Sequence, residues 1–525
     1  MVIRDLAILS CGAVTVPIYE SSLPEAAVYI LNDSDSKIVF VEDEAIFRKV
    51  WDHMSELKSL KQIIVINPPA NFKKYEGVYT FDEVMLLGSG AGQSVFDKNQ
   101  SDLNSESVAS YVYTSGTTGH PKGAVLTHGN FLAEMEGLGQ ILEFEAKSES
   151  LLFLPLAHIL ARVLQFAQLS NGFIQCYAES IDKLLDNISE VKPHIMASVP
   201  RIFEKVHGRV LQGVESGSAL KRNIFDWALK IGGERAAALK NGNGVSPLLS
   251  IKWAIAFKLV FSKLHAKLGG RISYFISGGA PLSKEIGDFF DAAGILILEG
   301  YGLTETTAAV TCNTRLSNKV GTVGCRVPGA ELKIASDGEI LVRGPLVFKG
   351  YFKNPEATKE AIDDEGWFHT GDIGVLDEEG FLKITDRKKD IIVTAAGKNI
   401  APQNIENLIK TDPIISQVMV HGDRRKFLSA LVTLNKDEIV HYAKKVGLDH
   451  KNYAELLQNE LLFQYVKSRI DEKNRHLAKY ETIKKFAILE NDFSVETGEL
   501  TPTLKVKRKF TSEKYKDIIE SFYKE

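Results

Sequence analysis

The sequence predicts an α/β protein with two domains. The expected architecture is a large N-terminal domain of layered α/β sheets with a small antiparallel β subdomain, followed by a small α+β C-terminal domain. Short apolar stretches alternate with helical patterns from the start of the chain, which is typical of parallel strands joined by helices. Residues 321–384 show strand-like runs separated by Gly-Asp and Glu-Gly turns, which favours antiparallel hairpins. At 525 residues the chain is also too long for one compact core.

The individual elements follow from local patterns of apolar residues and turn signals. A charged stretch at residues 385–390 marks a break, so we place the two domains at residues 1–386 and 387–525. The expected strands are 14–18, 37–41, 63–66, 108–113, 151–154, 295–298, 331–334, 339–342, 418–421 and 428–434, and the expected helical stretches are 24–32, 44–57 and 206–269.

Composition excludes several classes of function. The net charge of −4 gives no electrostatic basis for binding nucleic acid. Cys11, Cys176, Cys312 and Cys325 form no Cys-x-x-Cys pair, which argues against a zinc site or a disulfide framework and favours a reducing compartment. No apolar run is long enough to span a bilayer, and Asp5 interrupts the short apolar segment that begins the chain. We therefore expect a cytoplasmic protein.

The most informative stretch is a loop rich in glycine and hydroxyl residues after the strand at 108–113. Backbone amides of such a loop can converge on a phosphate, and Lys122 supplies a positive charge. The loop does not fit the nucleoside-triphosphatase template, because Lys122 follows Pro121 rather than the required glycine. A flexible linker is the alternative, but a Pro-Lys-Gly ending directly after a strand disfavours it. The candidate phosphate-binding residues are Thr114, Ser115, Gly116, Thr117, Thr118, Gly119 and Lys122.

A second motif follows the strand at 295–298, where α/β folds commonly bind ligands. Its glycines permit a tight turn close to a nucleotide, and Tyr301 can stack on a base. Thr304 can bond to phosphate, and Glu305 offers the hard oxygen that Mg²⁺ prefers. The candidate residues are Glu299, Gly300, Tyr301, Gly302, Thr304 and Glu305.

These motifs resemble those of the adenylate-forming superfamily, which includes acyl-CoA synthetases, luciferases and peptide-synthetase adenylation domains. Further motifs at 277–281, 368–374, 385–390, 397–400 and 498–508 appear in the family's order, and the likeness to long-chain fatty acyl-CoA synthetases is close. The resemblance implies ATP, Mg²⁺ and coenzyme A as partners of a long-chain fatty acid. It implies formation of acyl-AMP with release of pyrophosphate, and then transfer of the acyl group to coenzyme A with release of AMP.

The resemblance also assigns roles to residues. Lys505 bridges the substrate carboxylate and the α-phosphate in the adenylation step, and Lys507 and Lys509 are the alternatives that sequence physics leaves open. Asp372 binds the ribose hydroxyls, and Arg387 reaches the ribose and the α-phosphate. The remaining implied assignments are Lys122 and Thr304 as catalytic groups, Gly278, Gly279 and Ala280 against the adenine, and Thr114 and Glu305 at the metal.

Domain movement is implied as well. In the family the C-terminal domain rotates between the two half-reactions, which suits a short hinge between rigid bodies. Alignment places the hinge at Lys389, and the rotation brings the loop at Gly397 to the coenzyme A channel. His158 follows a strand end that borders the acyl pocket in relatives. A lone histidine is more often a packing residue, but here we favour a role in lining that pocket.

The sequence also raises two possible associations, one with a membrane surface and one with a second copy of the chain. Residues 252–268 form a basic amphipathic pattern whose apolar face is Trp253, Phe257, Val260, Phe261, Leu264 and Leu268. Packing of that face on the protein's own core is favoured, and peripheral contact with the inner face of a membrane is the alternative. Some relatives pair as dimers, so a homodimer is a further expectation.

Other functions stay open at this point. A fatty acyl-AMP ligase or an acyl-carrier-protein ligase shares the adenylation step, although no extra segment near Lys389 restrains rotation. The chain begins at a point that lies inside the N-terminal domain of relatives, so the first segment of that domain is expected to be missing. A nucleotide-binding but inactive homologue is therefore the third hypothesis.

Overall fold

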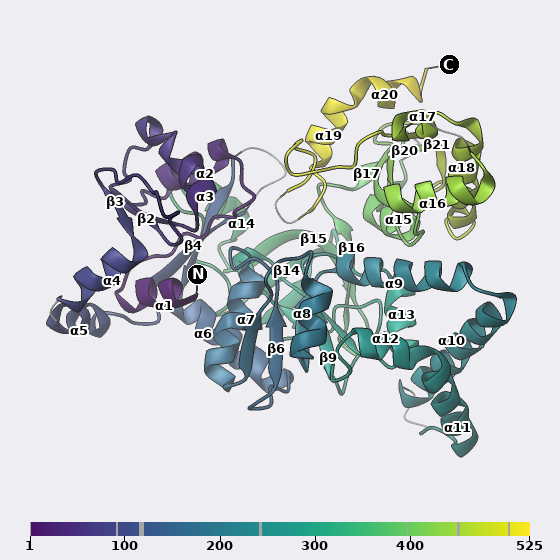
Figure 1. Cartoon of the computed structure of the whole chain (residues 1–525), viewed down its shortest axis with the longest axis horizontal. Coiled ribbons are helices and arrows are strands. Elements are labelled where there is room, and N and C mark those ends of the chain that lie inside the picture. Colours follow the sequence, from purple (N-terminus) through teal and green to yellow (C-terminus); the bar gives the residue numbers. More distant parts are fainter. Residues whose placement is uncertain are drawn as a thin grey trace.

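The computed structural model describes residues 2–90, 93–114, 120–240, 244–395, 397–448, 452–501 and 504–524. Figure 1 shows a broad N-terminal part, coloured purple through teal and green, and a smaller yellow-green C-terminal part beside helix α9 (Pro200–Glu215). The predicted α/β architecture with a large and a small domain is thereby confirmed. Within the described residues, no helix combines the length and apolar character needed to cross a membrane.

The N-terminal region is a small parallel sheet with helices around it. Strands β1 (Ile38–Val41), β2 (Gln62–Val65) and β3 (Val78–Thr80) lie in sequence order, and the first two match predicted strands. The predicted strand at 14–18 is wrong. Only Thr15 pairs, as an isolated bridge to Ser110, because Pro17 has no N–H to continue the ladder. The accompanying helices are α1 (Val2–Ser10), α2 (Pro24–Asp33), α3 (Glu44–Trp51), η1 (Met54–Glu56), α4 (Phe81–Ser89) and α5 (Gln93–Ser101).

The central element is a seven-stranded sheet of order β12-β11-β10-β9-β8-β6-β7. The five strands from β7 to β10 are parallel, whereas β10, β11 and β12 pair antiparallel. A separate antiparallel hairpin joins β4 (Val108–Thr114) to β5 (Lys122–Thr127). The bounds are β6 (Glu149–Leu152), β7 (Ile174–Tyr177), β8 (Ile195–Ser198), β9 (Tyr274–Ser277), β10 (Ile297–Tyr301), β11 (Thr311–Cys312) and β12 (Cys325–Arg326).

Alternate residues of the central strands enter two different cores, as the two-residue period of a strand requires. Ile195 and Ile276 face a core shared with α6 (His128–Ile141) and α7 (Ile159–Asn171), and Met196 and Phe275 face the other core. The helices on the second side are α8 (Leu184–Val191), α9, α10 (Ala219–Lys240), α12 (Ser262–Lys267) and α13 (Lys284–Ala292). The sheet is therefore a middle layer whose carboxyl edge is free for a site.

The predicted helical stretch at 206–269 is helical over most of its described residues, from the end of α9 onward, with breaks at 216–218 and 244–246. It contains α10, α11 (Pro247–Ala256), a π-helical turn η2 (Phe257–Phe261) and α12. The apolar face predicted for 252–268 packs on the core with α10 and α13, so the favoured interpretation of that face is correct.

The antiparallel β subdomain is confirmed. Strands β13 (Glu331–Ile334), β14 (Glu339–Arg343), β15 (Phe368–Leu376) and β16 (Leu382–Arg387) pair in sequence order, and α14 (Pro355–Ala361) lies between the second and third strands. The predicted domain boundary at 386/387 falls one residue before the end of β16, and the division itself stays a prediction.

The C-terminal part has cores of its own. Two apolar clusters draw only on residues 392–522, and the other clusters draw only on residues 9–382. The strands are β17 (Ile392–Val393), β18 (Asn399–Ile400), β19 (Ile415–His421), β20 (Leu428–Leu434) and β21 (Ile483–Ile488). The helices are α15 (Pro402–Ile409), α16 (Lys436–Val446), α17 (Tyr453–Leu457), α18 (Glu460–Asn474), α19 (Arg508–Lys514) and α20 (Lys516–Ser521).

Candidate active site

Several predicted site segments follow neighbouring strands at one edge of the central sheet. Gly278, Gly279 and Ala280 come directly after β9, and the second motif lies on and after β10. These two strands are parallel, with Ser277 opposite Glu299, so their loops leave the sheet side by side. His158 follows β6 in the same sheet. The structure thus gathers residues that are more than 140 positions apart in the sequence, from 158 to 305.

The loop after β10 is tightly constrained. A Cβ on Gly302 would lie 1.4 Å from the Ala308 carbonyl oxygen, so only glycine fits there. Thr304–Thr306 forms a 3₁₀ turn (η3), and Thr307 and Ala308 both have positive φ, at 56° and 109°. Such backbone conformations persist in non-glycine residues only when surrounding contacts enforce them.

Buried contacts from other elements enforce this backbone. The Glu134 carboxylate on α6 accepts a hydrogen bond of 2.7 Å from the Ala309 amide, and the Thr307 hydroxyl donates to the Leu346 carbonyl at 2.7 Å. Glu134 is fully buried, burial raises its pKa well above the usual range, and its second oxygen has no partner among the described residues. A buried carboxyl group therefore holds the loop. Sequence reasoning missed Glu134, since it lies on an otherwise ordinary helix.

Glu305 and Lys122 meet at Tyr351. The Tyr351 hydroxyl donates to Glu305 Oε1 at 2.9 Å, and Lys122 Nζ lies 5.0 Å from the centre of the Tyr351 ring. Tyr351 is held there because residues 349–352 pair with β5, with backbone bonds of 2.8–3.0 Å. Tyr351 also escaped prediction, since no sequence motif distinguishes it.

The hairpin of β4 and β5 positions the phosphate loop. Thr114 pairs with Lys122, so the two ends of the loop lie together beside Tyr351. Ser115, Gly116, Thr117, Thr118 and Gly119 lie outside the described residues.

Asp372 connects the second motif to the end of the antiparallel subdomain. The Tyr301 hydroxyl donates to Asp372 Oδ2 at 2.8 Å, and Arg387 Nε lies 3.0 Å from Asp372 Oδ1. The register of β15 and β16 places Asp372 opposite Arg387. Asp372 is only 4% exposed, so this carboxylate is fixed by its two partners. The expected stacking of Tyr301 on a base stays a prediction, and what the structure shows is that its hydroxyl orients Asp372.

Lys505 enters this cluster from the C-terminal domain. Burial lowers the pKa of its ammonium to about 8, with a further contribution from Arg387, and the charges of Asp372 and Glu305 oppose the shift. Lys505 as a whole is an exposed residue, so the burial that acts on its pKa is that of the surroundings of its ammonium group. Its backbone is held by a turn, with the Lys505 amide donating to Thr501 Oγ1 at 3.1 Å. A cation near Arg387, Asp372 and Glu305 is the arrangement expected where phosphate charge must be stabilised.

His158 lies close to Gly279 and near enough to Lys505 for the lysine's charge to affect its ring. Its Nδ1 accepts a bond of 3.2 Å from the Leu160 amide and so caps α7, and a Cβ built on Gly279 would lie 4.0 Å from its Nε2. Burial and the charge of Lys505 lower the pKa of His158 to about 4, so the ring is neutral at pH 7. A capping role and a lining role are compatible here, because different ring nitrogens serve them.

Glu299 contacts the segment that follows β9. It is buried, burial raises its pKa to about 7, and its Oε2 accepts a long bond of 3.4 Å from the Leu282 amide. It links β10 to the segment after β9, and this supporting contact is what the structure shows for it.

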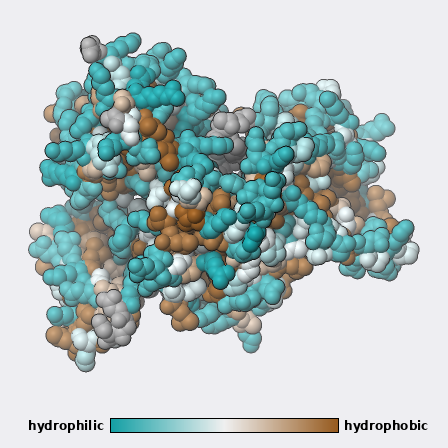
Figure 2. All heavy atoms as spheres, turned by 180° about the vertical axis from the view of Figure 1, so that it is seen from behind, coloured by the Kyte–Doolittle hydropathy of each residue, from teal (hydrophilic) through white to brown (hydrophobic). Residues whose placement is uncertain are grey.

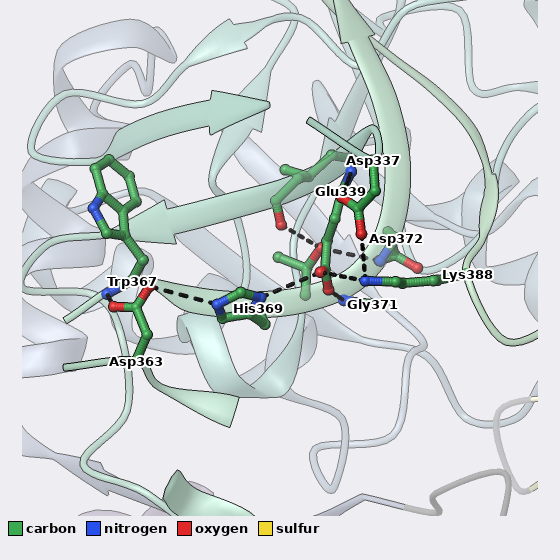
Figure 3. Close-up of polar contacts among 10 residues, drawn as sticks. Asp337, Glu339, Asp363, Trp367, His369, Gly371, Asp372 and Lys388 are labelled. Atoms are coloured by element: carbon green, nitrogen blue, oxygen red, sulfur yellow. Dashed lines mark hydrogen bonds and ion pairs between the residues drawn. The ribbon is translucent and has the colours of Figure 1, made fainter. Parts of the chain in front are cut away.

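Lys388, the residue before the predicted hinge, is tied to the turn at Gly371 through the buried carboxylate of Glu339 (Figure 3). Glu339 accepts from Lys388 Nζ at 2.9 Å, from the Gly371 amide at 2.9 Å and from His369 Nδ1 at 3.2 Å. Burial alone would raise the pKa of Glu339, but these donors outweigh it and lower the pKa. Lys389 follows as an exposed turn residue, so it is the first residue beyond this anchored end of β16.

Gly397 lies in the loop between β17 and β18. Its φ is +74°, and no heavy atom lies within 4 Å of a Cβ built on it. Backbone conformation, rather than space, therefore favours glycine at this position.

The same architecture occurs in other solved structures. The adenylation domain of the carboxylate reductase GR01_22995 from Mycobacterium chelonae matches with a TM-score of 0.75 at 22% identity, covering 99% of this chain and 78% of that one. ATP-bound MatB from Rhodopseudomonas palustris matches with a TM-score of 0.66 at 23% identity, covering 98% and 86%. At this level of identity the likeness concerns the fold.

Sequence comparison identifies the family. The AMP-binding enzyme model matches residues 1–352, and the AMP-binding enzyme C-terminal domain matches residues 389–525, so the chain belongs to the AMP-binding enzyme family. The long-chain-fatty-acid–CoA ligase FadD15 of Mycobacterium bovis is 40% identical over 99% of this chain and 86% of its own length. The peroxisomal long chain acyl-CoA synthetase 6 of Arabidopsis thaliana is 33% identical over 100% and 76%. The resemblance drawn from the motifs is thereby confirmed.

Proposed function

We propose that the protein is an ATP-dependent long-chain fatty acid–CoA ligase. In the first step a carboxylate oxygen of the fatty acid attacks the α-phosphorus of ATP, forming acyl-AMP and releasing pyrophosphate. In the second, the sulfur of coenzyme A attacks the acyl carbon, forming the thioester and releasing AMP. The relatives named as long-chain ligases support the substrate class. The observation that carries the proposal is the cluster of Tyr301, Asp372 and Arg387, to which Lys505 of the C-terminal part lies near enough for the charges of Arg387, Asp372 and Glu305 to act on its pKa.

In the adenylation step the side chains neutralise and orient anions. Lys505 approaches the reacting carboxylate and α-phosphate, and Lys122 faces the phosphates from the β4–β5 hairpin, so cations flank the triphosphate. Asp372, fixed by Tyr301 and Arg387, receives the ribose hydroxyls. Gly278, Gly279 and Ala280 pack against the adenine, and His158, neutral and partly oriented by α7, lines the acyl side.

A Mg²⁺ ion fits this site through few protein ligands. Among the described residues no group of three or more histidine, cysteine or acidic side chains gathers around a common point. Mg²⁺ bound with nucleotides commonly takes only one or two protein oxygens and completes its shell with phosphates and water. Glu305, whose Tyr351 bond engages only one oxygen, and the Thr114 hydroxyl would hold it. The bound ion would withdraw charge from the phosphate oxygens.

For the second step the C-terminal domain must turn about Lys389. The turn withdraws Lys505 and carries the Gly397 loop to the thiol channel. The anchoring of Lys388 to Glu339 and Asp337 supports a pivot just beyond it, because the chain is fixed up to residue 388. Among the described residues, polar side chains join the two parts at Arg201 and Ser416, Gln212 and Glu438, and Lys473 and Glu285, and such polar interfaces suit repeated opening.

The deciding experiment measures fatty-acid-dependent pyrophosphate release from ATP, with and without coenzyme A. Palmitate is compared with acetate and benzoate. We expect release with palmitate, acyl-CoA only when coenzyme A is present, and loss of release in Lys505→Ala but not in the matched Lys507→Ala or Lys509→Ala. Release without thioester would favour an acyl-AMP or acyl-carrier-protein ligase. A folded protein that releases no pyrophosphate would overturn the proposal and favour an inactive nucleotide-binding homologue.

Three associations stay predictions from the sequence: a cytoplasmic location, peripheral contact with the inner face of a membrane, and a homodimer. Sedimentation of the purified chain at several concentrations tests the last of these.

A further inference from the structure

We infer that the outer face of helix α11 and the turn after it docks on an anionic lipid bilayer. The face is formed by four aliphatic side chains, Leu248, Ile251, Ile255 and Leu259, which we call the hairpin stripe. They are 63%, 60%, 48% and 53% exposed. Their spacing of three and four residues places them along one side of a helix.

The hairpin stripe lies on the side of α11 opposite to the face that packs on the protein core. Ala256, Phe261 and Leu264 are buried in the core with α10 and α13, and Trp253 and Phe257 pack against that core. The sequence pattern of this region therefore has two apolar sides, of which only one has a partner within the protein. A membrane function for the Trp253 side is excluded, because that side is already occupied.

The position of the stripe makes it accessible. Helix α11 lies beyond the end of α10, at the lower right of Figure 1, where the hairpin of the two helices projects from the body of the protein. Figure 2, which views the molecule from behind, shows apolar surface at the corresponding lower left tip. Leu239, near the end of α10, is 51% exposed and extends the apolar surface toward that tip.

Charge identifies the occupant. Residues 235–284 contain eight lysines and arginines and no aspartate or glutamate, in a chain whose net charge is −4. Lys252, Lys258, Lys263 and Lys267 are exposed, and none of them has an ion-pair partner among the described residues. Lysines next to an exposed aliphatic stripe match the polar–apolar boundary of an anionic membrane, into which such a helix sinks its apolar side.

Helix α4 also exposes apolar side chains, but it lacks the basic residues that accompany the hairpin stripe. Met85, Leu86 and Leu87 on α4 are 60%, 75% and 65% exposed, but α4 carries Asp82 and Glu83 and no basic residue. An anionic surface would repel α4 and attract α11. The two helices therefore form a matched pair for experiment.

The test is flotation of the full purified chain with vesicles, using equal parts of phosphatidylglycerol and phosphatidylcholine or phosphatidylcholine alone. The variants are Ile251→Ser with Ile255→Ser, Lys252→Glu with Lys258→Glu, and the controls Leu86→Ser with Leu87→Ser, and Lys444→Glu with Lys445→Glu on α16. All eight positions are exposed, so the fold is kept, and melting temperature verifies this.

We expect binding to anionic vesicles only, and its loss when salt is raised from about 0.1 M to about 1 M, because the Debye length falls from about 10 Å to about 3 Å. Each hairpin variant should weaken binding by about tenfold or more, and each control should leave it unchanged. Pyrophosphate release without vesicles should be unaffected in all variants, so failure of this inference is separate from failure of the proposed activity.

Three outcomes would overturn the inference. In the first, the wild-type chain does not bind to anionic vesicles. In the second, the hairpin variants bind to them as tightly as the control variants do. In the third, Ile251→Ser with Ile255→Ser would dissociate a dimer in sedimentation, which would make the stripe an interface between copies of the chain.

Discussion

Arg201 of α9 donates two hydrogen bonds to Ser416 at the start of β19, one to the carbonyl oxygen and one to the hydroxyl, both 3.1 Å long. The same hydroxyl donates to Asp492 at 2.6 Å, so the contact continues into the C-terminal domain. Gln212 to Glu438, at 2.9 Å, and Lys473 to Glu285, at 3.4 Å, join the two parts along the same side. These contacts form in the arrangement that has Lys505 in the site, so they stabilise the state proposed for adenylation.

Arg201→Ala should therefore affect the two half-reactions differently. A hydrogen bond to a charged group contributes about 1.5–3 kcal/mol, and partial exposure reduces this, so we expect a loss of about fivefold in adenylation. Palmitate-dependent exchange of pyrophosphate with ATP measures that step. Thioester formation from supplied palmitoyl-AMP and coenzyme A should be unchanged or faster. Arg209→Ala, at an exposed arginine on the same helix, is the control. Equal loss in both half-reactions would contradict a role of the Arg201–Ser416 contact in stabilising the adenylation state.

The pH profile of adenylation should report Lys505. Its ordinary pKa of 10.5 is lowered to about 8 by burial and by Arg387, so the ammonium is lost as pH rises through that value. Because kcat/KM reports the free enzyme, we expect kcat/KM for ATP to fall above pH 8. In the complex the phosphates favour the charged form, so the alkaline limb of kcat should lie at higher pH. Lys505→Arg should remove the kcat/KM limb near pH 8, and an unchanged limb in that variant would assign the titration elsewhere.

Gly302→Ala and Gly397→Ala should separate steric exclusion from backbone preference. Alanine at 302 would place its Cβ 1.4 Å from the Ala308 oxygen, so the loop that carries Glu305 must shift and adenylation should be abolished. Alanine at 397 meets no atom but must adopt a φ of +74°, which costs about 1–2 kcal/mol. We expect near-normal pyrophosphate release and slower thioester formation for Gly397→Ala, measured by the two half-reactions. Loss of adenylation in Gly397→Ala would contradict its assignment to the second step.

The sequence predicts most of this fold because its local signals agree. Residues 331–334 form β13 as expected, and apolar runs flanked by turns mark β1, β2 and β20. The failure at 14–18 shows the limit of such patterns. An apolar stretch with a strand-like composition needs a continuous partner, and Pro17 leaves Thr15 with only a bridge to Ser110.

Site residues that belong to local sequence motifs are predictable from the sequence. Site residues whose roles depend on contacts with residues distant in the sequence are not. Asp372 and Arg387 were both candidates, but their pairing depends on the register of β15 and β16. Tyr351 and Glu339 carry no local signal, because a tyrosine in an isolated bridge and a glutamate at the start of a strand are common. Their roles arise only when strands far apart in the sequence bring them to Glu305 and Lys388.

Glu134 offers the most selective test of how the loop bearing Glu305 is supported. Glu134→Leu removes the acceptor of the buried Ala309 amide, and an unsatisfied buried donor costs about 1–3 kcal/mol. We expect a lower melting temperature and a higher KM for Mg-ATP, because Thr307 and Ala308 lose the contact that maintains their positive φ. Glu134→Gln keeps an acceptor for the Ala309 amide without a charge, in the direction in which burial raises the pKa of the Glu134 carboxyl group, so it should resemble the wild type. If Gln were as damaging as Leu, the carboxylate charge would matter, and the loop would be supported in some other way.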